Sequence, residues 1–400
     1  MAVKTKTVVL GVTGSIAAFK AAELANRFTK AGFQVNTVMT ASAMEFITPL
    51  TFRNITGRPV VTTMWDLASE FSVEHVALAE AADVVLIAPA TANIIAKIAC
   101  GMADDMLSCT VLATKAPVVI APAMNDNMWA NEVTQQNVDK LKKRGFTFIG
   151  PAYGRLASGK MGLGRLTELY EVYAITLKVL GRKGDLARRR IVVTAGGTAE
   201  PLDPVRSLAN RSSGKMGYAI AEAARNRGAE VTLISTPVAL TKPAGIEVVD
   251  VKTTEDMLNA VMAATEKADA LIMAAAPADF RPVKASATKI KRQNLNKLTL
   301  ELEKTPDILA NVKGSFVRVG FAAESDHVIE NAVDKIKRKG LDLIVANDIT
   351  EKGCGFGTDT NRVTIIDGKG KADALPMLTK DEVADRVLDR VAGLIKKKAK

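Results

Sequence analysis

The segment TVVLGVTGSIAAFK, residues 7–20, is the most informative stretch of the N-terminal half. A short run of β-branched residues leads into a glycine turn, and an alanine-rich stretch then continues over 16–31, which predicts a strand, a tight turn and a helix. Further apolar runs follow at 34–39, 83–88 and 116–121. Because these runs are almost continuously apolar, they are typical of parallel strands that helices cover on both faces.

The same pattern begins again with RIVVTAGGT at residues 190–198. A helix is expected at 216–227, and further strands at 230–235, 271–276 and 341–346. The two halves share this plan without a residue-level repeat. They predict an α/β protein with two doubly wound, Rossmann-like domains.

The boundary between the halves is expected at GRKGD, residues 181–185, which is polar and contains glycine. We therefore predict an N-terminal domain at 1–180, a linker at 181–190 and a C-terminal domain at 191–400. A chain of 400 residues is too long for one usual domain, which supports this division.

The composition indicates a globular protein from a reducing compartment. Apolar residues make up 48% and charged residues 24% of the chain, which excludes global disorder. The three cysteines, Cys100, Cys109 and Cys354, show no paired spacing, so neither a disulfide framework nor a cysteine-based zinc site is expected. No apolar run reaches the roughly 18 residues of a membrane helix, and the N-terminus fits a first strand better than a signal peptide. We expect a cytoplasmic protein without membrane contact.

The chain is basic, with a net charge of +11 from 54 basic and 43 acidic residues. Much of the excess lies in local runs at 188–190, 335–339 and 396–400. A nucleic-acid-binding module is one alternative, and salt-sensitive DNA or RNA binding would reveal it. Anionic small substrates explain the charge more simply, and no recognised nucleic-acid motif is present, so we expect no nucleic-acid partner.

Three polar turns follow predicted strands of the N-terminal half. GVTGSIA at 11–17 opens a helix whose backbone N–H groups suit a phosphate, although a plain tight turn explains the same residues. PATAN at 89–93 and PAMNDNMW at 122–129 lie where open α/β sheets bind ligands. The helix after PATAN is expected to continue through residues 101–105. Asn125, in the last turn, suits either a bound carboxylate or a helix cap.

His75 lies in SVEHVAL, residues 72–78, and a lone histidine is more often structural than catalytic. Together with the three turns, however, it closely resembles the flavin-dependent phosphopantothenoylcysteine decarboxylases in order, spacing and residue type. The resemblance implies that the protein binds FMN, that His75 assists oxidation of the thiol-bearing carbon of the substrate, and that Asn125 holds the substrate carboxylate. The residues expected on this resemblance to contact FMN are Gly14, Ser15, Thr40, Pro89, Thr91 and Asn93.

The glycine-rich segment RLASGKMGLGR, residues 155–165, matches the substrate lid of that family with one departure. The family usually has a cysteine that supplies the final proton, and Ser158 occupies this position. A serine hydroxyl is several pKa units less acidic than a thiol, whose reference pKa is about 8.5, so direct proton donation is expected to be poorer. Ser158 relays a proton through water, another group replaces it, or the serine was introduced in place of a natural cysteine; the sequence leaves these alternatives open. A ligase whose decarboxylase half is impaired because of Ser158 is the nearest competing interpretation.

Polar residues also crowd the turns of the C-terminal half. TAGGT at 194–198 has the shape of a phosphate-binding turn, and NRSSGKMG at 210–217 favours an anion site but lacks the P-loop frame. AAAPADFR at 274–281 follows a buried strand. Asp279 suits Mg2+ and Lys289 suits a phosphate, a pair that would activate a nucleotide; a solvated charged loop is the alternative.

These segments, in this order, strongly resemble the CTP-using phosphopantothenate–cysteine ligases. Both halves together resemble the bifunctional decarboxylase/ligases of coenzyme A biosynthesis, and the resemblance covers nearly all of residues 5–395. It implies that Lys289 assists attack of a carboxylate on the α-phosphate of CTP, that Asn210 holds the acyl-cytidylate, and that Asp279 holds Mg2+ or Mn2+. The residues expected on this resemblance to contact CTP are Met273, Ala274, Ala275, Asp279, Lys289, Pro306, Asp307, Ile308, Leu309, Phe321, Lys335 and Lys339.

The expected function is therefore ligation of 4'-phosphopantothenate with cysteine, followed by decarboxylation to 4'-phosphopantetheine. The family suggests a homo-oligomer with trimeric flavin halves and dimeric ligase halves, combined in a dodecamer. A flavoprotein that decarboxylates peptidyl-cysteine is another alternative. It shares the first half of the chain and leaves residues 190–350 unexplained.

Overall fold

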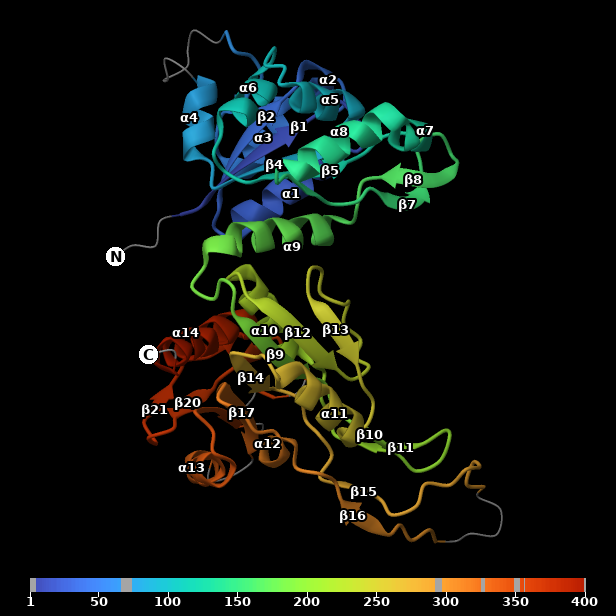
Figure 1. The fold of residues 1–400 in the computed structure, drawn as a ribbon, viewed down its shortest axis with the longest axis vertical. Helices are drawn as coiled ribbons and strands as arrows, with labels where there is room; N and C mark the ends of the chain where they lie inside the picture. The colour runs from blue at the N-terminus through green and yellow to red at the C-terminus, as the bar shows by residue number, and fades with distance from the viewer. Residues whose placement is uncertain are drawn as a thin grey trace. The chain divides into compact units, whose positions relative to one another are not determined.

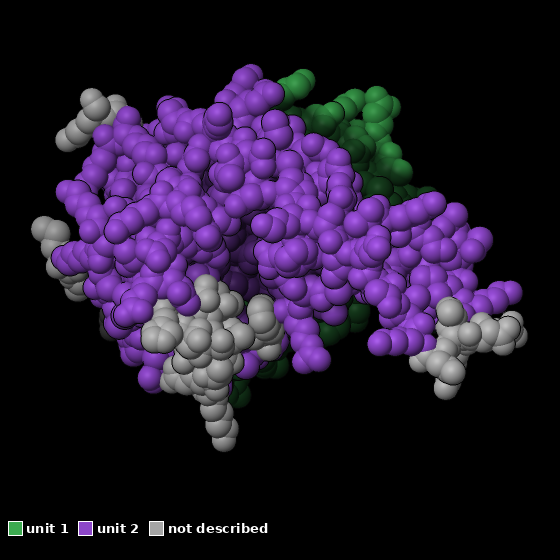
Figure 2. Space-filling view, turned by 90° about the horizontal axis from the view of Figure 1, so that it is seen from below, with its two compact units in different colours: residues 1–180 green, residues 181–400 purple. Residues whose placement is uncertain are grey.

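The computed structural model describes residues 5–65, 74–291, 297–324, 328–348, 353–355 and 357–398. The chain forms two compact units, residues 1–180 and 181–400, which Figure 2 colours separately. Residues 181–190, the predicted linker, cluster with the second unit. Each unit is built on a mainly parallel sheet with helices on both faces, which confirms the predicted fold class (Figure 1).

The sheet of the first unit is parallel throughout its described strands. Its strands, in spatial order, are β3 (Val60–Val61), β2 (Gln34–Met39), β1 (Thr7–Val12), β4 (Val84–Ala90), β5 (Val118–Pro122) and β6 (Thr147–Phe148). The strands β1, β4 and β5 are buried at every residue, as near-continuous apolar runs predict. The order reverses at β1, which places a crevice beside the carboxyl ends of β1 and β4.

Helices cover both faces of this sheet because side chains alternate along each strand. Val8 and Leu10 of β1 face one core cluster, and Val9 faces the other. The first cluster includes α1, α3 and α9, and the second includes α5, α6 and α8. The helices are α1 (Ala18–Lys30), α2 (Ala41–Met44), α3 (Pro49–Thr56), α4 (Glu74–Ala81), α5 (Ala92–Cys100), α6 (Met106–Ala113), α7 (Asp126–Ala130), α8 (Glu132–Lys143) and α9 (Leu169–Leu180). A separate hairpin pairs β7 (Ala152–Arg155) with β8 (Met161–Arg165).

The larger sheet of the second unit is parallel from β13 to β18 and ends in two antiparallel strands. Its strands, in spatial order, are β13 (Glu247–Asp250), β12 (Glu230–Ser235), β9 (Arg190–Ala195), β14 (Ala270–Met273), β17 (Val317–Glu324), β18 (Leu343–Asp348), β20 (Thr364–Asp367) and β21 (Ala372–Ala374). Smaller hairpins pair β10 (Ala199–Pro201) with β11 (Ser207–Ala209), β15 (Phe280–Pro282) with β16 (Leu302–Lys304), and β19 (Thr360–Asn361) with β22 (Leu378–Thr379).

Two groups of helices cover the two faces of the larger sheet. One core cluster joins Ile191 and Val193 of β9 to α10 (Lys215–Asn226) and α14 (Lys380–Lys398). The other joins Val192 to α11 (Thr254–Thr265), α12 (Ile308–Asn311) and α13 (Val328–Lys339). Within the described part of the chain, no helix combines the length and the apolar character needed to cross a membrane.

The structure corrects several predicted element bounds. The helix after PATAN does not continue through 101–105: α5 ends at Cys100, because Gly101 takes a left-handed φ of 74°. A new helix starts after Asp105, whose carboxylate accepts the Ser108 N–H in a capping box. The strand predicted at 271–276 ends at Met273, and the strand predicted at 341–346 lies at Leu343–Asp348. The sequence analysis did not predict β17.

Gly217 provides a test of how tightly α10 packs on β9. A Cβ atom at this position would lie 2.6 Å from the Ala195 Cβ and 2.7 Å from the Thr194 carbonyl oxygen. We expect Gly217→Ala to destabilise the second unit by about 1–3 kcal/mol, because strand backbone cannot move aside. Gly393→Ala is the matched control, since this glycine of α14 has open space around it, and it should stabilise by up to about 1 kcal/mol.

Urea unfolding, followed by far-UV circular dichroism, measures both changes. Both tryptophans, Trp65 and Trp129, lie in the first unit, so tryptophan fluorescence reports that unit separately. Equal unfolding midpoints for Gly217→Ala and the parent chain would contradict the close packing.

Candidate functional site

The turns after β1, β4 and β5 meet at the carboxyl edge of the first sheet. The Thr13 hydroxyl donates to the Pro89 carbonyl at 2.7 Å and accepts the Thr91 N–H at 3.1 Å. The Ala123 N–H donates to the Ala90 carbonyl at 3.0 Å, which joins the turn after β5 to the end of β4. The segments that carry Gly14, the predicted contacts at Pro89–Asn93, and Asn125 therefore lie together at this edge of the sheet. We call this edge the rim of the first unit.

The β7–β8 hairpin packs against the segment that carries Asn125. The Met124 N–H donates to the Gly164 carbonyl at 2.9 Å, and a Cβ at Gly164 would lie 2.2 Å from the Met124 carbonyl oxygen. Gly162 approaches the Asp126 side chain in the same way. Only glycine permits this approach, so the hairpin is held beside Asn125, with Ser158 exposed at its tip.

Asn125 itself caps α7, because its Oδ1 atom accepts the Asn127 N–H at 2.9 Å. Among the described residues, none accepts a hydrogen bond from its amide nitrogen, which leaves that group for a carboxylate. His75 is half-buried in the first turn of α4. Within the described ranges, no hydrogen bond joins His75 to the rim.

The residues at this rim fit a bound flavin with a phosphate. The Thr40 hydroxyl is buried and has no hydrogen-bond partner within the described residues. Gly14 packs closely on α2: a Cβ there would lie 2.4 Å from the Ser42 Cβ. An unpartnered hydroxyl beside the start of a helix is suited to a polar, anionic group.

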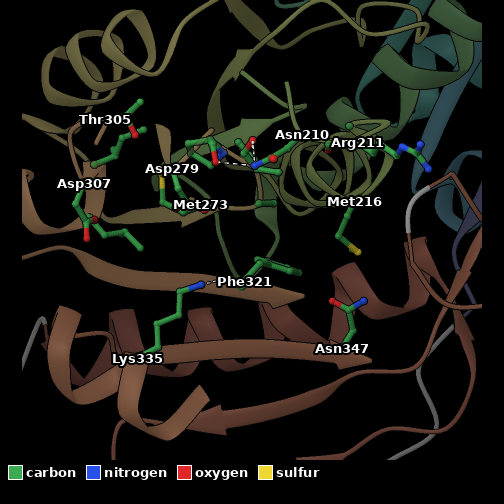
Figure 3. A pocket seen from close by; sticks show the side chains of 18 of the residues that line it. Asn210, Arg211, Met216, Met273, Asp279, Thr305, Asp307, Phe321, Lys335 and Asn347 are labelled. Carbon is green, nitrogen blue, oxygen red and sulfur yellow. Dashed lines mark hydrogen bonds between the residues drawn. The ribbon is translucent and has the colours of Figure 1, made fainter. Parts of the chain in front are cut away.

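The second unit contains a cavity of about 850 Å³ at the carboxyl edge of its sheet (Figure 3). The ends of β14, β17 and β18 line it, together with the turn before α10 and the start of α12. The predicted site residues that line it are Asn210, Met273, Ala274, Ala275, Asp279, Pro306, Asp307, Ile308, Leu309, Phe321, Lys335 and Lys339. The fold thus gathers these residues from five separate stretches of sequence: 210, 273–279, 306–309, 321 and 335–339.

The cavity is strongly basic. Among its described lining residues, the acidic ones are Asp279 and Asp307, and the basic ones are Arg211, Lys215, Lys304, Lys335, Arg338, Lys339 and Lys380. The Lys335 ammonium donates to the Phe321 carbonyl at 3.0 Å, and the Lys339 ammonium lies 3.2 Å from an Asp307 carboxylate oxygen (Figure 3). This excess of positive charge favours a ligand with several negative charges.

Lys380 and Lys215 stand at one end of this cavity and both bind the loop before β19. The Lys380 ammonium donates to the carbonyls of Gly355 and Thr358, and the Lys215 ammonium donates to the Gly357 carbonyl at 2.7 Å. Burial lowers the pKa of Lys380 below its usual range, and repulsion from Lys215 adds to this effect. An anion in the cavity would relieve that repulsion.

Hydrogen bonds connect the segment that carries Asn210 with the turn that carries Asp279. The Asn210 amide nitrogen donates to the Pro277 carbonyl at 2.9 Å, and the Ala276 N–H donates to the Gly196 carbonyl at 2.8 Å. The Thr305 N–H donates to the Asp279 carbonyl at 3.0 Å. These bonds fix the turn after β14, and Figure 3 shows Asn210 and Asp279 among the side chains around the cavity.

The side chain of Lys289 does not line the cavity of its own chain. It is exposed, and it is absent from the described lining residues. Across the described ranges, no group of three or more His, Cys, Asp or Glu side chains is placed to hold a metal. Asp279 nevertheless fits Mg2+, because this ion is usually held by one or two carboxylates and by the phosphates of its nucleotide.

Four further polar residues line the cavity without having been predicted: Lys304, Arg338, Asn361 and Lys380. Arg338 lies in the basic run at 335–339, of which only Lys335 and Lys339 are predicted to contact CTP. Lys380 begins a helix more than 30 residues after β18, and no motif marks it. The antiparallel strands at the end of the sheet return the chain to the cavity, so that Lys380 lines it. The local sequence contains no signal for this topology.

Comparison with known proteins finds relatives for both units. The Flavoprotein family matches residues 2–181, and the family described as DNA/pantothenate metabolism flavoprotein C-terminal domain matches residues 186–394. The chain is 45% identical over 388 residues to the coenzyme A biosynthesis bifunctional protein CoaBC of Vibrio cholerae, a match that covers 96% of this chain and 97% of that protein. It is 42% identical over 397 residues to the protein of the same name in Bacillus subtilis, with 98% of each chain covered.

Two solved structures are also similar. The crystal structure of the C-terminal domain of coenzyme A biosynthesis bifunctional protein CoaBC is 40% identical and has a TM-score of 0.46; the match covers 54% of this chain and 99% of that one. The crystal structure of the FMN-dependent cysteine decarboxylase SpaF is 38% identical and has a TM-score of 0.36; the match covers 40% of this chain and 90% of that one.

Gly164 tests whether the β7–β8 hairpin is fixed beside Asn125. We expect Gly164→Ala to undock the hairpin, because the new Cβ would meet the Met124 backbone oxygen at 2.2 Å. Gly162→Ala is the graded control, since its Cβ would meet the Asp126 side chain at 2.9 Å, and a side chain can move. Trypsin cleavage after Arg155 and Lys160 measures the change, and it should accelerate more for Gly164→Ala. Equal cleavage rates in the two variants would contradict the docking.

Proposed function

The chain belongs to the family of coenzyme A biosynthesis bifunctional proteins, and on this premise we propose which reaction each of its two units catalyses. It is an enzyme with a flavoprotein decarboxylase half and a ligase half. We assign to the second unit the CTP-dependent ligation of 4'-phosphopantothenate with cysteine. We assign to the first unit the FMN-dependent decarboxylation of the product to 4'-phosphopantetheine.

The basic cavity of the second unit is the observation that supports the ligase assignment. Its volume of about 850 Å³ and its excess of positive charge suit a nucleoside triphosphate. The apolar segments Met273–Ala275 and Pro306–Leu309 would hold the base and ribose, with Phe321, Lys335 and Lys339 beside them. Asp279 would hold Mg2+ or Mn2+ against the phosphates.

In the proposed ligation, a carboxylate oxygen of 4'-phosphopantothenate attacks the α-phosphorus of CTP. The bond from that phosphorus to the bridging oxygen breaks, pyrophosphate leaves, and an acyl-cytidylate remains. Lys289, which lies outside the described lining of the cavity in its own chain, would offset the negative charge that gathers at the α-phosphate. Asn210 holds the acyl-cytidylate while the cysteine amine attacks its carbonyl carbon, and CMP leaves as the amide forms. Activation is needed because a free carboxylate has no good leaving group.

In the proposed decarboxylation, FMN held at this rim would supply a reversible hydride acceptor for the substrate. The amide of Asn125 would bind the substrate carboxylate, and His75 would take the proton released as the thiol-bearing carbon is oxidised. The docked hairpin would exclude water from the rim and present Ser158 to the substrate. The alternative of an impaired decarboxylase half finds no support in the relatives, which are named as bifunctional.

Exposed apolar side chains support the proposal that both units associate with further copies. In the first unit, Ile16 and Phe19 are each 59% exposed near the start of α1, and Leu50 is 60% exposed on α3, which packs against α1. In the second unit, Phe280 and Leu302 are exposed on the β15–β16 hairpin. We propose that the first set forms a trimer contact and the second a dimer contact.

Incubation with 4'-phosphopantothenate, cysteine, CTP and Mg2+ tests the proposed ligation. We expect pyrophosphate, CMP, CO2 and 4'-phosphopantetheine, identified by mass. In the same assay Lys289→Gln should lower pyrophosphate release by at least about 100-fold, because a neutral amide cannot offset the charge at the α-phosphate. Lys284→Gln, an exposed lysine of the same segment, is the matched control and should keep the parent rate.

The flavin absorption spectrum of Lys289→Gln should be unchanged, which shows that the first unit is intact. Pyrophosphate release by Lys289→Gln at the parent rate would remove Lys289 from the reaction. Absence of CTP-dependent ligation in the parent chain would refute the assignment of the second unit.

Ser158→Cys tests the source of the final proton. A thiol is a better general acid than an alcohol near neutral pH, so we expect this variant to speed the final reduction step and to leave ligation unchanged. The measurement supplies phosphopantothenoylcysteine directly and follows CO2 and the product mass. A species two hydrogens lighter than 4'-phosphopantetheine should accumulate with the parent chain and decline with the variant. Equal and complete turnover by both chains would show that proton donation does not limit the parent chain.

A further inference from the structure

Asp203 is a buried carboxylate that accepts hydrogen bonds from two distant parts of the second unit. It is only 4% exposed and lies in the turn between β10 and β11. Its Oδ1 atom accepts the N–H groups of Val205 and Arg206, each at 2.8 Å, which closes the turn. Its Oδ2 atom accepts the Ile290 N–H at 3.1 Å, across 87 residues of sequence. Ile290 is the residue next to Lys289.

A second backbone bond holds the same segment to the same turn. The Ser286 N–H donates to the Leu202 carbonyl at 2.9 Å. The segment therefore meets the turn at two points, one on each side of residues 287–289. The β15–β16 hairpin supports it from the other direction, because the Val283 N–H donates to the Glu301 carbonyl at 3.0 Å and Arg281 lies 2.8 Å from Glu303.

The turn that contains Asp203 also leads directly to Asn210. It continues into β11, which ends at Ala209, one residue before Asn210. The Asn210 amide donates to the Pro277 carbonyl at 2.9 Å, where the segment toward Lys289 begins. The chain that carries Asn210 and the chain that carries Lys289 are thus tied at Pro277 and again at Asp203.

We propose that Asp203 is a positioning residue of the ligase, which holds the backbone segment that carries Lys289 against the turn before Asn210 through the Ile290 amide. This proposal rests on the role proposed above for Lys289. Burial opposes ionisation of Asp203, but the bonds from Val205, Ile290 and Arg206 outweigh it and lower its pKa below the usual range. An ionised acceptor makes stronger bonds to backbone N–H groups than a neutral one. Fixing a flexible lysine before the reaction reduces the ordering needed to reach the transition state.

Asp203→Asn removes the acceptor of the Ile290 N–H, and with it the ion pair from Arg206 to the same oxygen, but keeps the oxygen that closes the turn. The remaining amide oxygen can still close the local turn, whereas the new NH2 group faces the Ile290 N–H and cannot accept from it. We expect kcat for pyrophosphate release to fall by about 10- to 100-fold, the scale of a misplaced catalytic group. KM for CTP should stay within about threefold, because Asp203 does not line the cavity.

Asp256→Asn is the matched control. Its carboxylate also accepts backbone N–H groups, those of Lys252 and Thr253, but at the start of α11 and without contact to the Lys289 segment. It should keep kcat and KM within about threefold of the parent chain. Ile290→Pro removes the other partner of the bond and should lower kcat as Asp203→Asn does. Loss of CTP binding would show that Asp203→Asn does not fold. In that case Ile290→Pro still tests the bond.

Amide hydrogen exchange at Ile290 reports the bond directly and should accelerate in Asp203→Asn but not in Asp256→Asn. Faster exchange with an unchanged or increased kcat would overturn the proposal, as would a lower kcat with unchanged exchange or an effect on KM alone. Lys289→Gln is measured in parallel. If it reacts at the parent rate, the role of Lys289 is refuted; if it is impaired while Asp203→Asn and Ile290→Pro are normal, only the positioning role is refuted.

Discussion

Both sites depend on the parallel pairing of strands. Parallel strands deliver all their carboxyl ends to the same edge of a sheet, so the turns that follow them meet there. In the first unit this edge holds the turns after β1, β4 and β5. In the second unit it holds the ends of β14, β17 and β18 around one cavity. The helices that begin at these turns direct their N–H groups toward the same edge, where an anion is favoured.

Threonine hydroxyls tie the neighbouring turns together in both units. Thr13 follows the first strand of its sheet and bridges to Pro89 and Thr91, beyond the adjacent strand. In the second unit the Thr194 hydroxyl accepts the Ala275 N–H at 3.1 Å, and the Thr198 hydroxyl accepts the Ala278 N–H at 2.8 Å. A hydroxyl both donates and accepts, so the Thr13 side chain satisfies two backbone groups at the end of β4. Hydrogen bonds from threonine hydroxyls therefore hold the turns of each unit in one arrangement.

The charge of the chain is concentrated by the fold of the second unit. Basic side chains from α10, α13, α14 and the β15–β16 hairpin converge on a single cavity. Exposed ion pairs such as Lys242 with Asp250 contribute little to stability. Two of the cavity lysines, Lys335 and Lys380, donate to backbone carbonyls, whereas Lys339 pairs with Asp307 and Lys215 pairs with Asp359. An anionic small molecule as the ligand of this cavity therefore explains part of the net positive charge of the chain.

The sequence by itself determined the α/β class, four strands in each of the two main sheets and nearly every turn that carries a proposed site residue, because apolar runs and glycine turns are local signals. Residues such as Asn210, Asp279 and Asn125 stand in those turns. Tertiary structure alone decided how the turns meet. The docking of the β7–β8 hairpin on Met124, the return of Lys380 to the cavity and the bond from Ile290 to Asp203 each join segments far apart in the chain. Such contacts depend on strand order and on close backbone approach, which have no counterpart in the local pattern of residues.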